Sequence, residues 1–166
     1  MQTIEEVEQA FTELRKSTVK ALDAVSDESL SQPVAEGFRN LGQIAWHLVT
    51  TYPEMMSRTG LAVKAVDADA PVPAEVAAIR QGYEAVSQEL IEQIKSAWTD
   101  ETLQEVDDMY GFKWKRALSL AILHSHEMFH LGQMTVLMRQ AGLKVPGVCG
   151  PSKEEWAAMG MEPPPY

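Results

Sequence analysis

Four long segments of this chain repeat apolar residues at the spacing of an amphipathic helix, and this pattern limits the possible folds more than any other feature. The segments span residues 3–25, about 40–58, about 74–98 and about 112–141. Residues three and four positions apart share one face of a helix, so each segment carries an apolar stripe that has to be buried. Four such segments in 166 residues predict an all-α fold, a four-helix bundle.

The connectors before the second, third and fourth helices are each about a dozen residues long. A dozen extended residues reach about 40 Å, which exceeds the length of about 30 Å of a 20-residue helix. Each connector can therefore run the length of a bundle, so neighbouring helices need not be antiparallel. The acidic connector at residues 99–111 fits either a short helix or a hairpin.

The C-terminal region is expected to add one short helix. Ser152 is a suitable N-cap, Glu155 stands in the capping-box position three residues later, and the helix is expected to end at Met159. The length of the chain fits a single domain that covers residues 1–166.

The composition favours a cytoplasmic protein without nucleic-acid or membrane partners. Apolar residues make up 45% of the chain and charged residues 23%, and the net charge of −10 argues against a phosphate-binding surface. The N-terminus has no basic start followed by an apolar run, and the longest strongly apolar run, residues 117–123, is far shorter than the roughly 20 residues that span a bilayer. The single cysteine, Cys149, excludes an intrachain disulfide and fits a reducing compartment.

Two of the four histidines, His126 and His130, stand four positions apart in the last predicted helix. Such positions lie about 40° apart around a helix axis, with Cβ atoms about 6 Å apart. Both imidazoles can therefore direct a nitrogen at one cation, at about 2.0–2.1 Å if the ion is zinc. A lone histidine on such a face is typical of the core, but a pair at this spacing favours metal binding.

His47 is the candidate third ligand, because it lies mid-helix on the flank of an apolar stripe. Adjacent bundle helices pack about 8–10 Å apart, a distance that two inward imidazoles can bridge through one ion. The alternative is a histidine bonded to solvent or to a neighbour. Gln133, one turn beyond His130, either orients a metal-bound water or ligand or is a polar residue at the rim of the bundle.

His124 lies about 160° around the helix from His126, so these two histidines cannot share an ion. An apolar face beyond the needs of one core predicts a subunit contact, and we expect a homodimer through the face of His124. The alternative is burial under the C-terminal segment. The other members of this face are Met128, Leu131, Thr135 and Met138.

Two further groups of residues have a structural and a functional interpretation. Asp107, Asp108 and Tyr110 either hang over one end of the bundle or belong to a solvated acidic loop. Cys149 lies in a turn-rich segment without a base nearby in the sequence, which argues against a nucleophile.

Five short motifs follow one another along nearly the whole chain, and their ordered combination resembles the DinB-like family of bacterial proteins. The motifs are Gly42-x-x-x-x-His47-Leu48, Tyr110-Gly-x-x-Trp114, His126-x-x-x-His130-x-Gly-Gln133, Arg139-Gln-Ala-Gly-Leu-Lys-Val-Pro-Gly147 and Gly150-Pro-Ser-Lys-Glu-Glu-Trp156.

This resemblance implies a four-helix bundle whose middle connection crosses over, with a divalent ion held by three histidines. Carried over residue by residue, the ligands are His47, His126 and His130, and the ion is zinc or nickel. The wider superfamily includes low-molecular-weight-thiol S-transferases and a thiol-dependent isomerase, and dimers are frequent in it. Family members often read His-His-Arg-Gly-Gln where this chain has Phe129 before His130 and Leu131 after it, so the roles of that second histidine and arginine are not carried over.

Three hypotheses about function follow. The first is a metal-dependent transferase or hydrolase that adds a low-molecular-weight thiol or water to a small-molecule electrophile, with Gln133 orienting the incoming group. The second is a non-catalytic metal- or ligand-binding protein, such as a stress-response dimer, because no acid–base residue is evident beside the histidines. The third is a helical bundle whose histidines are structural.

Overall fold

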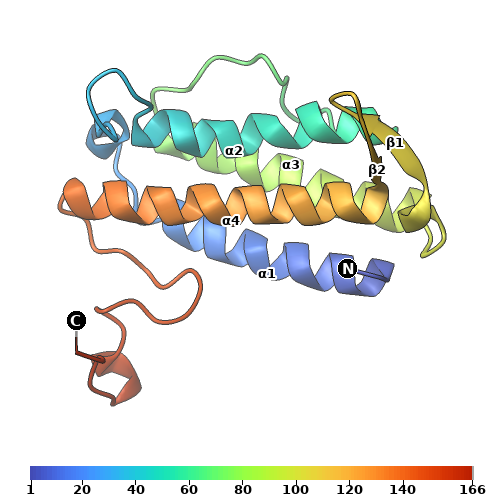
Figure 1. Cartoon of the computed structure of the whole chain (residues 1–166). Coiled ribbons are helices and arrows are strands. Elements are labelled where there is room, and N and C mark those ends of the chain that lie inside the picture. The colour runs from blue at the N-terminus through green and yellow to red at the C-terminus, as the bar shows by residue number, and fades with distance from the viewer. Residues whose placement is uncertain (166) are drawn as a thin grey trace.

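The computed structural model describes residues 1–165 and contains four long helices (Figure 1). The helices are α1 (Ile4–Leu22), α2 (Leu41–Met56), α3 (Val76–Ala97) and α4 (Arg116–Gln140). Among residues 1–165, no helix is long and apolar enough to cross a membrane. The all-α bundle predicted from the apolar periodicity is therefore confirmed, and its helices begin and end within a few residues of the expected positions.

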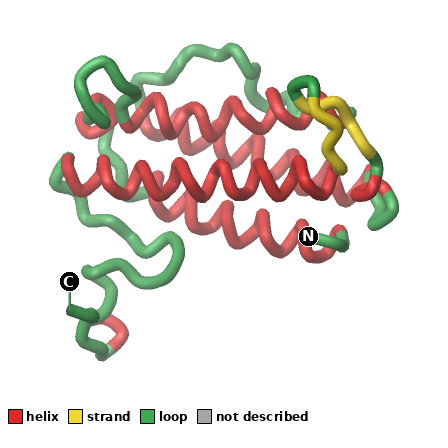
Figure 2. Tube along the Cα trace, in the orientation of Figure 1, coloured by secondary structure: helices red, strands yellow, loops and turns green. Residues whose placement is uncertain are grey.

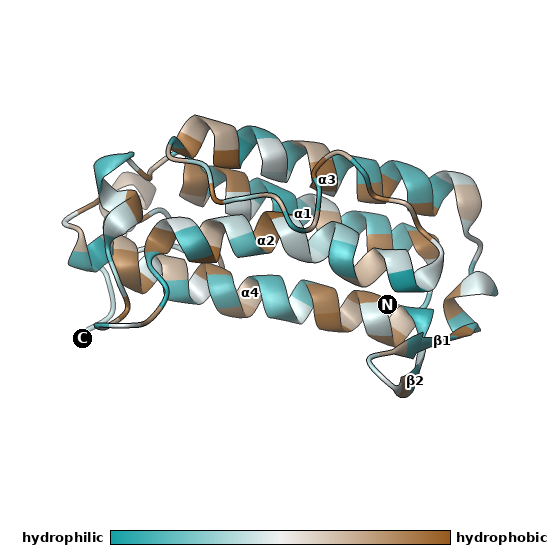
Figure 3. Ribbon diagram, turned by 90° about the horizontal axis from the view of Figure 1, so that it is seen from above, coloured by the Kyte–Doolittle hydropathy of each residue, from teal (hydrophilic) through white to brown (hydrophobic). Residues whose placement is uncertain are grey.

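Each helix packs against two neighbours: α1 and α2 both contact α3 and α4. Helices α2 and α3 run in the same direction, because residues 60–75 return along the outside of these two helices before α3 begins (Figures 1 and 3). Glu89 and Gln93 of α3 accept hydrogen bonds from backbone N–H groups of residues 62–65 and hold this segment in place. The middle connection is therefore a crossover.

A small antiparallel hairpin follows α3 at one end of the bundle (Figure 2). Strands β1 (Val106–Met109) and β2 (Phe112–Lys115) are joined by Tyr110 and Gly111, which have φ angles of 60° and 85°. Two successive positive φ angles are typical of a tight hairpin turn. The sequence placed the start of the last helix at residue 112, which is wrong by four residues because residues 112–115 pair with β1.

The short C-terminal helix is smaller than expected: only residues 157–159 form one 3-10 turn. The Ser152 N–H donates to the Glu155 carboxylate at 3.1 Å, but the Ser152 hydroxyl has no partner in the described part of the chain. The Glu155 carboxylate also accepts hydrogen bonds from Lys20 of α1 and from the N–H of Gly147. Glu155 therefore ties the C-terminal segment to the bundle.

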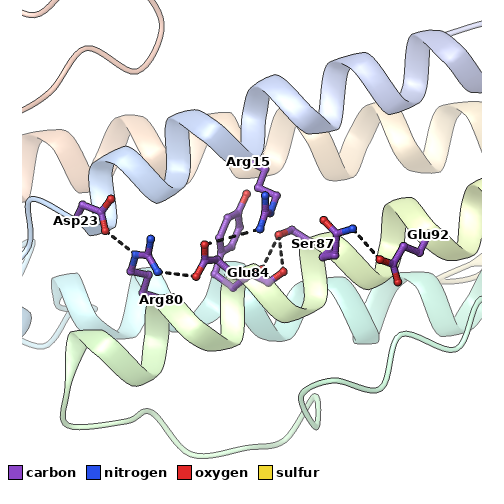
Figure 4. A network of polar contacts seen from close by, with 8 residues as sticks. Arg15, Asp23, Arg80, Glu84, Ser87 and Glu92 are labelled. Atoms are coloured by element: carbon purple, nitrogen blue, oxygen red, sulfur yellow. Dashed lines mark hydrogen bonds and ion pairs between the residues drawn. The ribbon is translucent and has the colours of Figure 1, made fainter.

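Surface ion pairs connect α1 and α3 (Figure 4). Arg80 lies 2.5 Å from Asp23 and 2.6 Å from Glu84, and Glu84 is 3.8 Å from Arg15. Exposed pairs of this kind contribute at most about 1 kcal/mol each. The bundle therefore depends mainly on its interior.

The interior contains one polar junction that joins all four helices. Glu127 of α4 is 1% exposed and accepts three hydrogen bonds, from Thr18 of α1 at 2.6 Å, from Tyr52 of α2 at 2.6 Å and from Tyr83 of α3 at 2.5 Å. Burial raises the pKa of Glu127, and the three hydroxyl donors oppose that shift. These hydrogen bonds replace the hydration that a buried carboxyl group loses.

We expect Glu127→Ala to lower the free energy of unfolding by about 3–5 kcal/mol, because it leaves three buried hydroxyls without an acceptor and opens a cavity. Glu127→Gln keeps the shape and one oxygen, and should cost about 1–3 kcal/mol. Urea denaturation of both variants measures these losses. Ser125→Ala, at an exposed position of the same helix, is the control and should stay within about 0.5 kcal/mol of the wild type. Equal stability of Glu127→Ala and the control would contradict this role.

Candidate metal centre

Three imidazole nitrogens converge between α2 and α4. The Nε2 atom of His126 lies 3.3 Å from Nε2 of His47 and 3.1 Å from Nε2 of His130. One ring nitrogen from each residue lies within 4.8 Å of the other two. The structure thus brings together the three histidines selected from the sequence, and their arrangement is compatible with a metal site.

The spacing of these nitrogens suits a shared cation. A neutral imidazole has one N–H and one lone pair, so three ring nitrogens that face one another cannot all direct lone pairs inward without a positive partner. A tetrahedral zinc ion with bonds of about 2.0–2.1 Å places its ligand atoms about 3.3 Å apart. The observed separations of 3.1 and 3.3 Å are close to that value.

The environment of the cluster keeps the imidazoles neutral. Burial, together with the charges of Arg39 and of the other two histidines, lowers the pKa of His47 to about 4. Burial also lowers the pKa values of His126 and His130. Because a metal ion binds the deprotonated ring nitrogen, protons compete little for this cluster at neutral pH.

The outer ring nitrogens have unequal support. The side-chain oxygen of Gln133 lies 2.7 Å from Nδ1 of His130, and acceptance of this proton leaves the Nε2 lone pair of His130 facing the cluster. Nδ1 of His47 lies 3.5 Å from the Thr51 hydroxyl, and Nδ1 of His126 is buried without a partner among residues 1–165. Gln133 therefore orients a ring of the cluster, and its expected contact with a ligand remains a prediction.

A cavity of about 280 Å³ opens beside His47. Trp46 shapes one wall: its ring packs on Gly82 of α3, where a Cβ atom would lie only 2.9 Å from the indole. The indole N–H also donates to the Ala70 carbonyl at 2.8 Å. This bond holds the connection of residues 60–75, the crossing segment, over the cavity. The complete lining consists of Arg39, Gln43, Trp46, His47, Thr50, Ala68, Asp69, Ala70 and Val72.

The remaining sequence candidates lie outside this cluster. His124 packs edge-on against Phe11 of α1, with ring centroids 5.7 Å apart. Cys149 is exposed and does not belong to the histidine cluster. Tyr110 donates to Glu54 at 2.5 Å and its ring lies under Arg58, so the hairpin is fastened to the end of α2.

The face of α4 on which we based the dimer is largely covered within the chain. Leu131 and Met138 are 0% exposed and belong to the core. Exposed apolar side chains of α4 lie instead at Leu118, Phe129 and Val136, and the ring of Phe129 contacts that of His130 at a centroid distance of 5.2 Å. The homodimer remains a prediction, and these exposed apolar side chains of α4 are a candidate surface for it.

Sequence reasoning missed two residues around the site. Glu127 was not selected because an acidic residue in a helix is usually exposed to solvent. In the structure it is buried and is the neighbour of His126 in the sequence. Arg39 stands in the second connector, where no periodicity marks it, yet it lines the cavity beside His47. The clue to Glu127 was its place between apolar and histidine neighbours in an otherwise apolar segment.

The sequence is similar to a known protein family and to a curated bacterial protein. The sequence profile of the DinB family matches residues 1–164. The uncharacterized protein YrdA of Bacillus subtilis strain 168 is 43% identical over 148 residues, which cover 89% of each chain.

Two crystal structures have a similar fold. A DinB-like protein from Bacillus cereus ATCC 10987 superposes with a TM-score of 0.85 at 46% identity, covering 89% of this chain and 98% of the other. The DinB-like protein YjoA from Bacillus subtilis superposes with a TM-score of 0.67 at 19% identity, covering 86% and 97%, which shows likeness of fold alone.

The lowered histidine pKa values predict how the stability of the metal-free protein depends on pH. The pKa of an unfolded histidine is about 6.5, and the pKa values of the three folded histidines are lower. The unfolded chain therefore binds more protons than the folded one as the pH falls toward and below that value. We therefore expect the metal-free protein to lose stability between pH 7 and pH 4.5. Urea denaturation in a chelator, at several pH values, measures this loss.

The variant His47→Gln/His126→Gln/His130→Gln is the matched comparison for this pH dependence. It lacks the three groups, so its stability should fall less steeply with pH. Parallel curves for the wild type and the variant would contradict the lowered pKa values.

Proposed function

Because the chain belongs to the DinB family, we propose that it is a metal-dependent enzyme whose His47, His126 and His130 hold one divalent ion, zinc or nickel. A divalent ion at such a site lowers the pKa of a thiol or water bound to it and so supplies a nucleophile at neutral pH. The reaction class is the transfer of a low-molecular-weight thiol, or of water, to a small electrophile. The observation that carries this proposal is the convergence of three Nε2 atoms beside a cavity.

The protein groups have separate tasks in this scheme. The three imidazoles supply neutral nitrogen ligands and leave the remaining coordination positions for the reacting groups. Gln133 keeps the ring of His130 in the tautomer that presents Nε2. The cavity walls from α2 and the crossing segment hold the small molecule next to His47. Among the described residues that line the cavity, Asp69 is the one carboxylate. The scheme gives it no task, because an activated thiol needs no general base.

We expect the purified protein to bind one zinc or nickel ion per chain, and each of His47→Ala, His126→Ala and His130→Ala to weaken binding at least about 100-fold, because each removes one of three ligands. Calorimetric titration and elemental analysis measure this. His124→Ala removes a histidine of the same helix outside the cluster and is the matched control. Unchanged affinity in all three cluster variants would refute the metal site.

We further expect the metal-loaded protein to accelerate conjugation of a small thiol, such as cysteine, to a bimane electrophile, or hydrolysis of a small activated ester. The acceleration should disappear in His126→Ala and in a chelator. A panel of thiols and electrophiles with a fluorescence readout measures the first reaction. A wild-type protein that binds the metal but accelerates neither reaction would contradict the enzymatic part of the proposal.

A second candidate is a non-catalytic metal-binding dimer, for example one that acts in a stress response. The exposed apolar residues of α4, among them Phe129 beside His130, favour it. Light scattering during size-exclusion chromatography measures the dimer. Metal binding and dimerisation without either reaction would favour this candidate over the enzyme.

A further inference from the structure

Arg39 differs from the other arginines of the chain. The chain has six arginines, and five of them form ion pairs with carboxylates: Arg15, Arg58, Arg80, Arg116 and Arg139. The guanidinium group of Arg39 has no ionic partner among residues 1–165, although acidic residues outnumber basic ones by 24 to 14. Arg39 is exposed and lines the cavity beside His47.

The backbone of Arg39 is held in a fixed position relative to His47. The Arg39 carbonyl accepts from the N–H of Val34 at 3.0 Å, and the next residue, Asn40, forms a capping box with Gln43 at the start of α2. Arg39, Gln43 and His47 follow one another at intervals of four residues, and all three line the cavity. The cavity is therefore lined both by a cationic group, Arg39, and by one residue of the histidine cluster, His47.

Arg39 would share this cavity with any ion that His47 holds. Because the guanidinium group and such an ion are both positively charged, they would repel each other. An anion between the guanidinium group and the ion would remove this penalty, because both cations attract it.

We propose that Arg39 binds the carboxylate of a bifunctional ligand whose other end, a thiol, reaches the histidine cluster, so that the molecule used by this protein is a mercapto carboxylic acid. This inference rests on the proposed metal site. The cavity lining also includes Ala68, Ala70 and Val72, which suit a short carbon chain. The lining contains one guanidinium group and one carboxylate, Asp69, and the chain has a net charge of −10. This balance suits a ligand with one negative charge better than a phosphate dianion.

The test uses the full-length protein loaded with Co²⁺, because a thiolate bound to this ion gives a charge-transfer absorption band. We compare mercapto carboxylic acids from thioglycolate to 6-mercaptohexanoate with the mercapto alcohols of the same chain lengths. For at least one length, the wild type should bind the acid about tenfold or more tightly than the alcohol. Arg39→Gln should lose this preference and keep the affinity for the alcohol, while Arg39→Lys should retain part of it.

The control is Lys16→Gln, which removes one exposed positive charge on α1 and should leave the preference unchanged. Circular dichroism confirms that each variant is folded. No preference in the wild type, an unchanged preference in Arg39→Gln or an equal loss in Lys16→Gln would overturn the role of Arg39. Absence of Co²⁺ binding by the wild type would refute the metal site itself, so the two failures are distinguishable.

Discussion

The structure depends on one buried carboxyl group. Glu127 is the acceptor at which hydroxyl groups of α1, α2 and α3 meet, so it fixes how far α4 is rotated about its own axis. Successive residues of a helix are separated by about 100°, so with Glu127 facing the centre of the bundle, His126 and His130 face α2. The polar junction of the core thus determines where the histidine cluster forms.

The histidine cluster and the polar junction at Glu127 differ in how their polar groups are paired. Glu127 is an acceptor surrounded by donors, and its three hydrogen bonds are complete. The three histidines present ring nitrogens to one another at 3.1 and 3.3 Å, an arrangement that is compatible with a shared cation. Gln133 and the lowered pKa values favour the neutral rings that such a cation needs. The site is therefore prepared by the same packing that stabilises the bundle.

Much of this architecture could be predicted from the sequence, because helical periodicity and the i, i+4 spacing of His126 and His130 are local signals. The crossover came only from the family resemblance, since a connector of a dozen residues permits either direction. The sequence left a short helix and a hairpin open for residues 99–111, and it placed the start of α4 four residues too early, because both depend on strand pairing. Arg39 and Glu127 were missed for a common reason: burial and access to a cavity depend on which helices become neighbours.

The central claim is that His47, His126 and His130 bind one ion together. The most direct measurement is a crystal structure of the zinc-loaded protein with anomalous data collected on both sides of the zinc absorption edge. The account predicts a single strong anomalous peak among the three Nε2 atoms, with bonds of about 2.0–2.1 Å. An empty cluster, or an ion bound instead at Cys149 or at surface carboxylates, would contradict it.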